Sequence, residues 1–174
     1  QWSETYYDLL TAAPAFRPDT AKTADVLILG LGAGTLTRQL RSVYGPSLHM
    51  TGVEIDRVII EAGKKFFDLD AAGAVIVNDE ARSWLTRHNR TWNAIIVDVF
   101  THQLSVPAEF TTVEFFQTIA EHLTPDGILA MNVVTFPNDT AVSGLRQALR
   151  TAFPFVLAAN NHSDRIGNTI FFAS

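Results

Sequence analysis

The chain of 174 residues is long enough for one domain with a substantial core. A composition that is 47% hydrophobic and 18% charged is that of a globular protein and excludes a disordered one. The net charge of −5, with scattered Lys and Arg, argues against nucleic-acid binding, which requires a basic stripe. No apolar run has the length of a membrane span, no signal peptide is visible, and the absence of cysteine excludes disulfides and thiolate metal sites. We therefore expect a cytoplasmic protein that binds neither nucleic acid nor membrane.

The first residues are expected to precede the main domain as a helix and a linker. Residues 2–10 predict a short amphipathic helix, and Pro14 and Pro18 then interrupt the chain. We predict an N-terminal helix and linker over residues 1–20, followed by a single domain over residues 21–174. The sequence does not begin with Met, which leaves open whether it is a fragment of a longer protein.

Strands and helices then alternate along the chain. The strands are predicted near residues 26–30, 48–54, 74–78, 93–98, 127–134, 154–159 and 168–173. The helices are predicted near residues 34–44, 56–67, 80–88, 111–123 and 138–152, with Asp56 and Asn138 as N-caps and a turn over Pro125–Gly127 before a strand. This alternation predicts a parallel sheet with helices on both faces. The last two strands are joined by too short a segment for a crossover helix, so they are expected to pair antiparallel. The predicted fold class is thus α/β, a doubly wound, seven-stranded, mainly parallel sheet with an antiparallel last strand.

The end of the first strand carries the strongest functional signal. The branched apolar run Val26–Leu29 indicates a buried parallel strand, and Gly30, Gly32 and Gly34 follow it. Glycines there let the backbone approach a ligand closely, and the next helix offers free N–H groups. Glu54 closes the second strand roughly 20 residues on, where an acidic side chain can bind ribose hydroxyls. These features predict a nucleoside site.

The spacing of the glycines helps to separate the classes of nucleoside site. The dinucleotide fingerprint is G-x-G-x-x-G/A, but here the third glycine comes one position early and Thr35 stands in its place. The tighter loop favours S-adenosylmethionine, which has no pyrophosphate. Nicotinamide or flavin binding and a turn that binds nothing remain as alternatives.

Several segments together resemble the spermidine synthase (polyamine aminopropyltransferase) family. They are Gly30–Gly34, Val53–Asp56, the acidic pair Asp79–Glu80, Ala94–Asp98, Phe110–Phe116 and Leu123–Leu129. The resemblance extends from about residue 24 to residue 135 and implies the class I S-adenosylmethionine-dependent methyltransferase fold. It also implies that Glu54 binds the adenosyl ribose, that Asp79 or Glu80 binds the adenine amino group, and that the glycine loop lines the methionine-derived part. Asp79 is alternatively a helix cap.

Two positions depart from the pattern of that family. Ala33 stands where the family has an aspartate in the glycine loop, and Thr101 replaces a second aspartate three residues after Asp98. In the family these carboxylates hold amines, and a desolvated ammonium needs carboxylate partners. Asp98 is retained, and we predict that it orients or deprotonates the incoming nucleophile. We therefore expect methyl transfer from S-adenosylmethionine. Aminopropyl transfer from decarboxylated S-adenosylmethionine and a catalytically idle binding module are the alternatives.

The loop after Asp98 is expected to cover the substrate. Thr101 and His102 are predicted to contact a small-molecule acceptor, for which an amine is one candidate, and a histidine there could act as a base near neutral pH. Tyr6 and Tyr7 are a further candidate for the pocket edge. No two histidines have the helical spacing of metal ligands, so we do not expect a metal site. The sequence has neither a nucleophile elbow nor a phosphate-loop lysine, which excludes hydrolase and kinase chemistry. The sequence does not determine the oligomeric state, and a homo-oligomer is one candidate.

Overall fold

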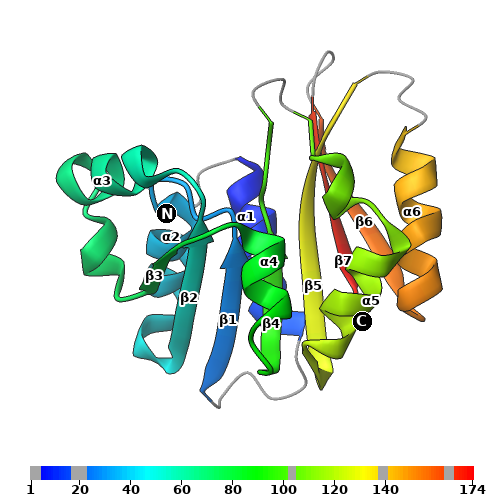
Figure 1. The fold of residues 1–174 in the computed structure, drawn as a ribbon, viewed down its shortest axis with the longest axis horizontal. Helices are drawn as coiled ribbons and strands as arrows, with labels where there is room; N and C mark the ends of the chain where they lie inside the picture. The colour runs from blue at the N-terminus through cyan, green and yellow to red at the C-terminus, as the bar shows by residue number, and fades with distance from the viewer. Residues whose placement is uncertain (1–4, 17–22, 102–104, 137–140, 163–166) are drawn as a thin grey trace.

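The computed structural model describes residues 5–16, 23–101, 105–136, 141–162 and 167–174, and within them seven strands form one sheet (Figure 1). The strands are β1 (Ala24–Leu29), β2 (Leu48–Glu54), β3 (Val75–Asn78), β4 (Trp92–Val97), β5 (Leu123–Thr135), β6 (Val156–His162) and β7 (Gly167–Ala173). Their order is β3-β2-β1-β4-β5-β7-β6. Strands β1 to β5 pair in parallel, and β7 pairs antiparallel with both β5 and β6. The predicted fold class is therefore confirmed.

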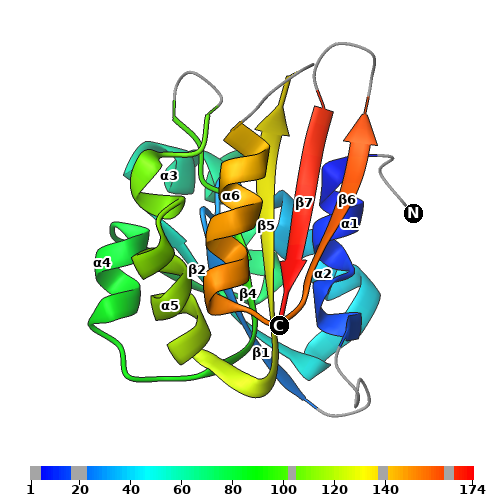
Figure 2. The same ribbon diagram turned by 90° about the vertical axis from the view of Figure 1, so that its right-hand side faces the viewer.

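Helices cover both faces of the sheet, with α1 and α2 on one face and α4, α5 and α6 on the other (Figure 2). Helix α3 lies toward the β3 end of the sheet (Figure 1). The α-helices are α1 (Tyr6–Thr11), α2 (Thr35–Tyr44), α3 (Arg57–Phe66), α4 (Ala81–Thr86), α5 (Val113–Glu121) and α6 (Ala141–Ala152). Short 3₁₀ helices are η1 (Ala13–Phe16), η2 (Gly45–Ser47), η3 (Leu69–Ala72) and η4 (Ala108–Phe110). None of the described helices is long and apolar enough to cross a membrane.

The run Val26–Leu29 of β1 is apolar without interruption because helices cover it on both faces of the sheet. Val26 and Ile28 belong to the core beneath α1 and α2, whereas Leu27 and Leu29 belong to the core beneath α4, α5 and α6. All four side chains are fully buried. The part of a strand that is covered on both faces must be apolar at every position, as is usual for a parallel sheet.

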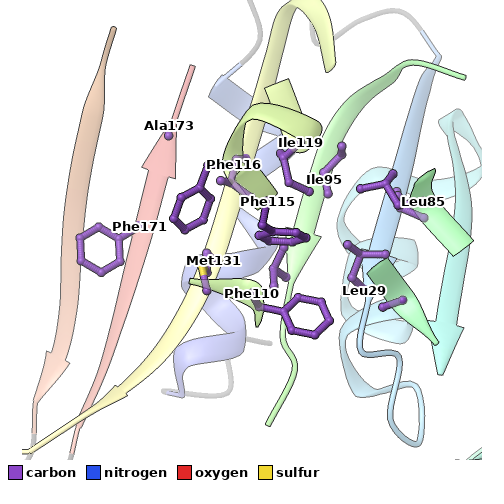
Figure 3. Close-up of a cluster of buried hydrophobic side chains, with 14 of the residues drawn as sticks. Leu29, Leu85, Ile95, Phe110, Phe115, Phe116, Ile119, Met131, Phe171 and Ala173 are labelled. Carbon is purple, nitrogen blue, oxygen red and sulfur yellow. The ribbon is translucent and has the colours of Figure 1, made fainter. Parts of the chain in front are cut away.

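The aromatic residues of the Phe110–Phe116 segment fill the core beneath α5. Phe110 and Phe115 meet edge to face with ring centroids 5.0 Å apart, and Phe116 is fully buried beside them. Figure 3 shows these rings between α5 and the sheet, close to Met131 of β5. These buried rings fix α5 over the centre of the sheet.

The boundaries differ from the prediction in one informative place. Strand β5 begins at Leu123, whereas the sequence places its start near residue 127. Trp92 pairs with Leu123 and Ala94 pairs with Ile128, so the register shifts at this point. The turn over Pro125–Gly127 is therefore taken up as an irregularity within the strand and does not precede it.

The N-terminal helix packs on the main domain. Leu10 of α1 and Ala13 of η1 are fully buried in the core formed with β1 and α2. The predicted domain boundary falls on residues 17–22 and the predicted cap Asn138 on residues 137–140, so both lie outside the described residues. α1 thus brings its own side chains to the carboxyl end of the sheet, where the site lies.

Candidate active site

A cavity of about 370 Å³ opens at the carboxyl ends of β1, β2 and β4. Its walls come from the glycine loop after β1, from α1, and from η4 with the residues before it. The carboxyl edge is where ligands bind in doubly wound sheets, because the strand order reverses there and leaves a crevice. Among the predicted site residues, those that line it are Gly30, Gly32, Glu54, Glu80 and Asp98.

Two of the glycines in the loop serve different purposes. Gly30 has φ +89°, and a Cβ there would lie 2.2 Å from the backbone oxygen of Asp98, so only glycine allows the two segments this close. Gly32 has φ +55°, but a Cβ there would meet nothing within 4 Å. The space above Gly32 is therefore open to a ligand. Gly34, the third predicted residue, caps α2 with φ +87° and is not part of the cavity wall.

Contacts from behind hold the glycine loop in place. The Arg38 guanidinium donates to the carbonyl oxygens of Ala33 at 3.2 Å and Phe67 at 2.6 Å. Thr37 donates its hydroxyl to the carbonyl oxygen of Gly34 at 2.8 Å. The loop is consequently preformed, and its open side faces the cavity.

Glu54 joins the glycine loop to the start of α3. One carboxylate oxygen accepts the backbone N–H of Gly32 at 2.8 Å, and the other accepts that of Asp56 at 3.0 Å. The side chain is only 9% exposed and lines the cavity. Each carboxylate oxygen has a second lone pair, so both can still accept hydroxyl protons. The N-cap of α3 is Asp56, as predicted, and it accepts from the backbone N–H of Val58 at 2.8 Å.

The two neighbouring acidic residues after β3 differ in their roles. Glu80 lines the cavity and caps α4 by accepting from the backbone N–H groups of Arg82 at 2.8 Å and Ser83 at 2.7 Å. Burial alone would raise the pKa of Glu80, but the hydrogen bonds from Ser83 and Arg82 outweigh it and lower that pKa. Asp79 is not part of the cavity wall and pairs with Arg87. The interpretation of Asp79 as the helix cap is wrong, because Glu80 takes that position.

Asp98 follows β4 and receives hydrogen bonds from two distant segments. Its Oδ1 accepts from the Nδ2 of Asn132 at 2.8 Å, and its Oδ2 accepts from the Tyr6 hydroxyl at 3.4 Å. Burial raises the pKa of the Asp98 carboxyl to about 6, although both hydrogen bonds act in the opposite direction. A carboxyl with such a pKa can accept a proton near neutral pH.

Tyr6 and Asn132 are the two hydrogen-bond partners of Asp98, and of these the sequence predicts only Tyr6, as part of a candidate pocket edge. Tyr6 stacks on Tyr7 with ring centroids 4.2 Å apart, and both line the cavity. Burial, and then the adjacent Asp98 carboxylate, raise the pKa of Tyr6 well above its usual value, so the phenol keeps its proton. The paired aromatic residues were a visible signal for Tyr6. Nothing in the sequence singles out Asn132, whose role depends on strand order.

The predicted acceptor residues are not part of the described cavity wall. The backbone N–H of Thr101 donates to the carbonyl oxygen of Ser105 at 2.8 Å, and the two hydroxyls lie 2.8 Å apart. His102 lies outside the described residues. A contact of either residue with the acceptor therefore stays a prediction.

The described wall of the cavity has a one-sided charge. Its carboxylates are Glu54, Glu80, Asp98 and Glu109, and the part of the wall that the structure describes holds no Lys, Arg or His. Such a wall attracts a cationic ligand and disfavours an anionic one. In the same described residues, no three His, Asp or Glu side chains gather closely enough to hold a metal ion.

Comparison with known proteins decides the family. Residues 4–159 match the family model of the spermine/spermidine synthase domain. The chain belongs to the spermine/spermidine synthase family. A relative named as a probable polyamine aminopropyl transferase of Bifidobacterium longum is 38% identical over 128 residues, which cover 74% of this chain and 27% of that protein. The chain therefore spans only about a quarter of the length of this family relative.

Other relatives of this spermine/spermidine synthase domain are named either as spermidine synthases or as methyltransferases. The crystal structure of a probable spermidine synthase from Corynebacterium glutamicum superposes with a TM-score of 0.82 at 29% identity, over 98% of this chain and 63% of that one. An eEF1A lysine and N-terminal methyltransferase homolog of Drosophila melanogaster is 28% identical over 159 residues, which are 86% of this chain and 23% of that protein. Aminopropyl and methyl transferases thus both occur among the relatives of the domain.

Proposed function

We propose that the cavity binds the adenosyl part of a sulfonium donor and that the protein transfers a carbon group from its sulfur to an amine. The observation that carries the proposal is Glu54, whose carboxylate bridges the glycine loop and α3 at the open space above Gly32. There it can accept the two ribose hydroxyls, while Glu80 can accept from the adenine amino group. The Gly30–Gly34 loop then lies along the remainder of the donor.

The reaction is a displacement at a carbon bonded to a positive sulfur. The lone pair of the amine forms the new carbon–nitrogen bond while the carbon–sulfur bond breaks, and its electron pair stays on sulfur as a neutral thioether. Asp98 accepts the proton that the amine loses. Because the sulfonium is already a good leaving group, alignment of donor and acceptor is the main task of the protein.

Aminopropyl transfer from decarboxylated S-adenosylmethionine is the better supported form of this reaction. The acidic wall suits a donor with an ammonium and a sulfonium, whereas intact S-adenosylmethionine would bring a carboxylate into a described wall without a cation. The names of the aminopropyltransferase relatives support the same choice. The preference for methyl transfer in the sequence analysis is not confirmed by these comparisons.

Methyl transfer from S-adenosylmethionine remains a second candidate because of two side chains. Ala33, in the cavity wall, and Thr101 supply no carboxylate where the sequence resemblance leads one to expect an aspartate at each position. An ammonium at either place has to rely on other carboxylates, of which Glu109 and Asp98 line the same cavity. The methyltransferase relative supports this candidate.

Thermal unfolding with matched concentrations of the two donors distinguishes the candidates. A ligand at 100 times its Kd stabilises the native state by about 2.7 kcal/mol, so the tighter donor raises the Tm further. We expect the larger rise with decarboxylated S-adenosylmethionine, and with a short diamine we expect a product that carries an added aminopropyl group by mass spectrometry. A larger rise with S-adenosylmethionine would favour methyl transfer, and no rise with either would contradict the proposed function.

A further inference from the structure

We propose that Asn132 and Asn168 are positioning residues that hold the Asp98 carboxylate in the orientation in which it accepts the proton of the acceptor. The proposal rests on the proposed function for the role of Asp98. Two hydrogen bonds join the three side chains in a row. Asn168 donates to the Oδ1 of Asn132 at 2.9 Å, and Asn132 donates to the Oδ1 of Asp98 at 2.8 Å.

The three side chains come from neighbouring strands in the middle of the sheet. Asp98 directly follows β4, Asn132 lies on β5, and Asn168 lies on β7, which pairs with the other edge of β5. Asn132 is fully buried, and Asn168 is partly exposed. A row of hydrogen-bonded polar side chains therefore runs across the sheet, from the partly exposed Asn168 on β7 to Asp98 at the cavity.

Chemistry allows only one direction for these hydrogen bonds. An ionised carboxylate can only accept, so Asn132 must turn its amide NH₂ group toward Asp98. Its amide oxygen then faces Asn168, which must donate. Since Asn132 is fully buried, neither end of its amide can turn to solvent in compensation. Asn168 thus fixes which end of Asn132 faces the carboxylate.

Loss of the Asn168 donor should act on Asp98 at a distance. Without that donor the Asn132 amide is free to turn its oxygen toward Asp98, where it accepts only from the protonated carboxyl. The ionised form of Asp98 then loses a hydrogen bond, so the pKa of the Asp98 carboxyl rises by about one unit. The other titratable groups that line the described cavity are Tyr6, Tyr7, Glu54, Glu80 and Glu109, and the substitution leaves all of them in place.

The test compares Asn168→Leu with a matched substitution on the same strand. Thr169→Val removes the hydroxyl contacts with Asn160 at 2.9 Å and Thr135 at 3.4 Å, and among the described residues no hydrogen bond joins Thr169 to Asp98. The titration of the Asp98 carboxyl is followed by carbon-13 NMR in the full chain, with the signal assigned by its loss in Asp98→Asn. We expect the midpoint to rise by about one unit in Asn168→Leu and to stay unchanged in Thr169→Val. Asn168→Gln keeps an amide donor at a partly exposed position, so it should reverse most of this rise in the Asp98 midpoint.

Turnover provides the second readout. In Asn168→Leu the acidic limb of the pH–kcat profile should move to higher pH by the same amount, with KM for the donor unchanged. An unchanged Asp98 titration in folded Asn168→Leu would overturn the inference, and Asn168→Ala replaces this variant if it does not fold. Absence of any transfer by the unaltered chain would contradict the proposed function instead, while the NMR titration would still decide the role of Asn168.

Discussion

At the scale of single residues, Asp98 lines the cavity at a cost in stability. Its folded-state pKa of about 6 lies above the ordinary value of 3.8, so the native state disfavours the ionised form. The contribution to stability is therefore fully present below about pH 4 and is lost as the pH rises through about 6. At neutral pH the ionised carboxylate destabilises the fold, which is the trade-off expected if Asp98 has the proposed role in proton transfer.

Asp98→Asn tests this trade-off. We expect the substitution to raise the free energy of unfolding at pH 8 by about 2 kcal/mol more than at pH 4, because the neutral amide carries no charge to desolvate. Transfer activity should be lost. Urea denaturation at the two pH values measures the difference, with the exposed Asp126→Asn as the control. An equal change at both pH values would contradict the assigned pKa.

At the scale of elements, substitutions at two positions of the glycine loop are expected to have different effects. One should lower stability, and the other should weaken donor binding. Gly30→Ala places a Cβ against the Asp98 backbone, so we expect a loss of about 3 kcal/mol of stability by urea denaturation. Gly32→Ala places a methyl group in open space, where only the positive φ costs about 1 kcal/mol. The second variant should fold but bind the donor poorly in a calorimetric titration. Normal donor binding by Gly32→Ala would show that the ligand does not lie above this residue.

The same elements show which local features can be predicted from the sequence. The cap of α3 at Asp56 and the glycine turn after β1 are predictable, because their signals lie within a few residues. The choice between Asp79 and Glu80 was not, because two adjacent acidic residues can cap the same helix. Only the geometry shows that Glu80 takes the cap and the cavity wall, while Asp79 pairs with Arg87.

At the scale of the whole molecule, the fold class was predictable and the composition of the site only in part. Alternating strands and helices, and the short connection before β7, were sufficient for the sheet and its antiparallel strand. Tyr6 and Asn132 reach Asp98 from 92 and 34 residues away in the chain. Such contacts follow from strand order and from the packing of α1 on the sheet, which periodicity does not encode. Tyr6 was predictable as a candidate for the pocket edge, but its hydrogen bond to Asp98 was not.

The central claim is that Glu54 holds the sugar of a sulfonium donor over the glycine loop. Calorimetric titration of decarboxylated S-adenosylmethionine into the unaltered chain, Glu54→Ala and the control Glu61→Ala tests it most directly. Glu61 is an exposed carboxylate on α3 that pairs with Arg57. We expect Glu54→Ala, checked for folding by its thermal unfolding, to weaken binding at least about tenfold, or about 1.4 kcal/mol, and Glu61→Ala to leave it unchanged. Equal donor affinity in folded Glu54→Ala and the unaltered chain would contradict the account.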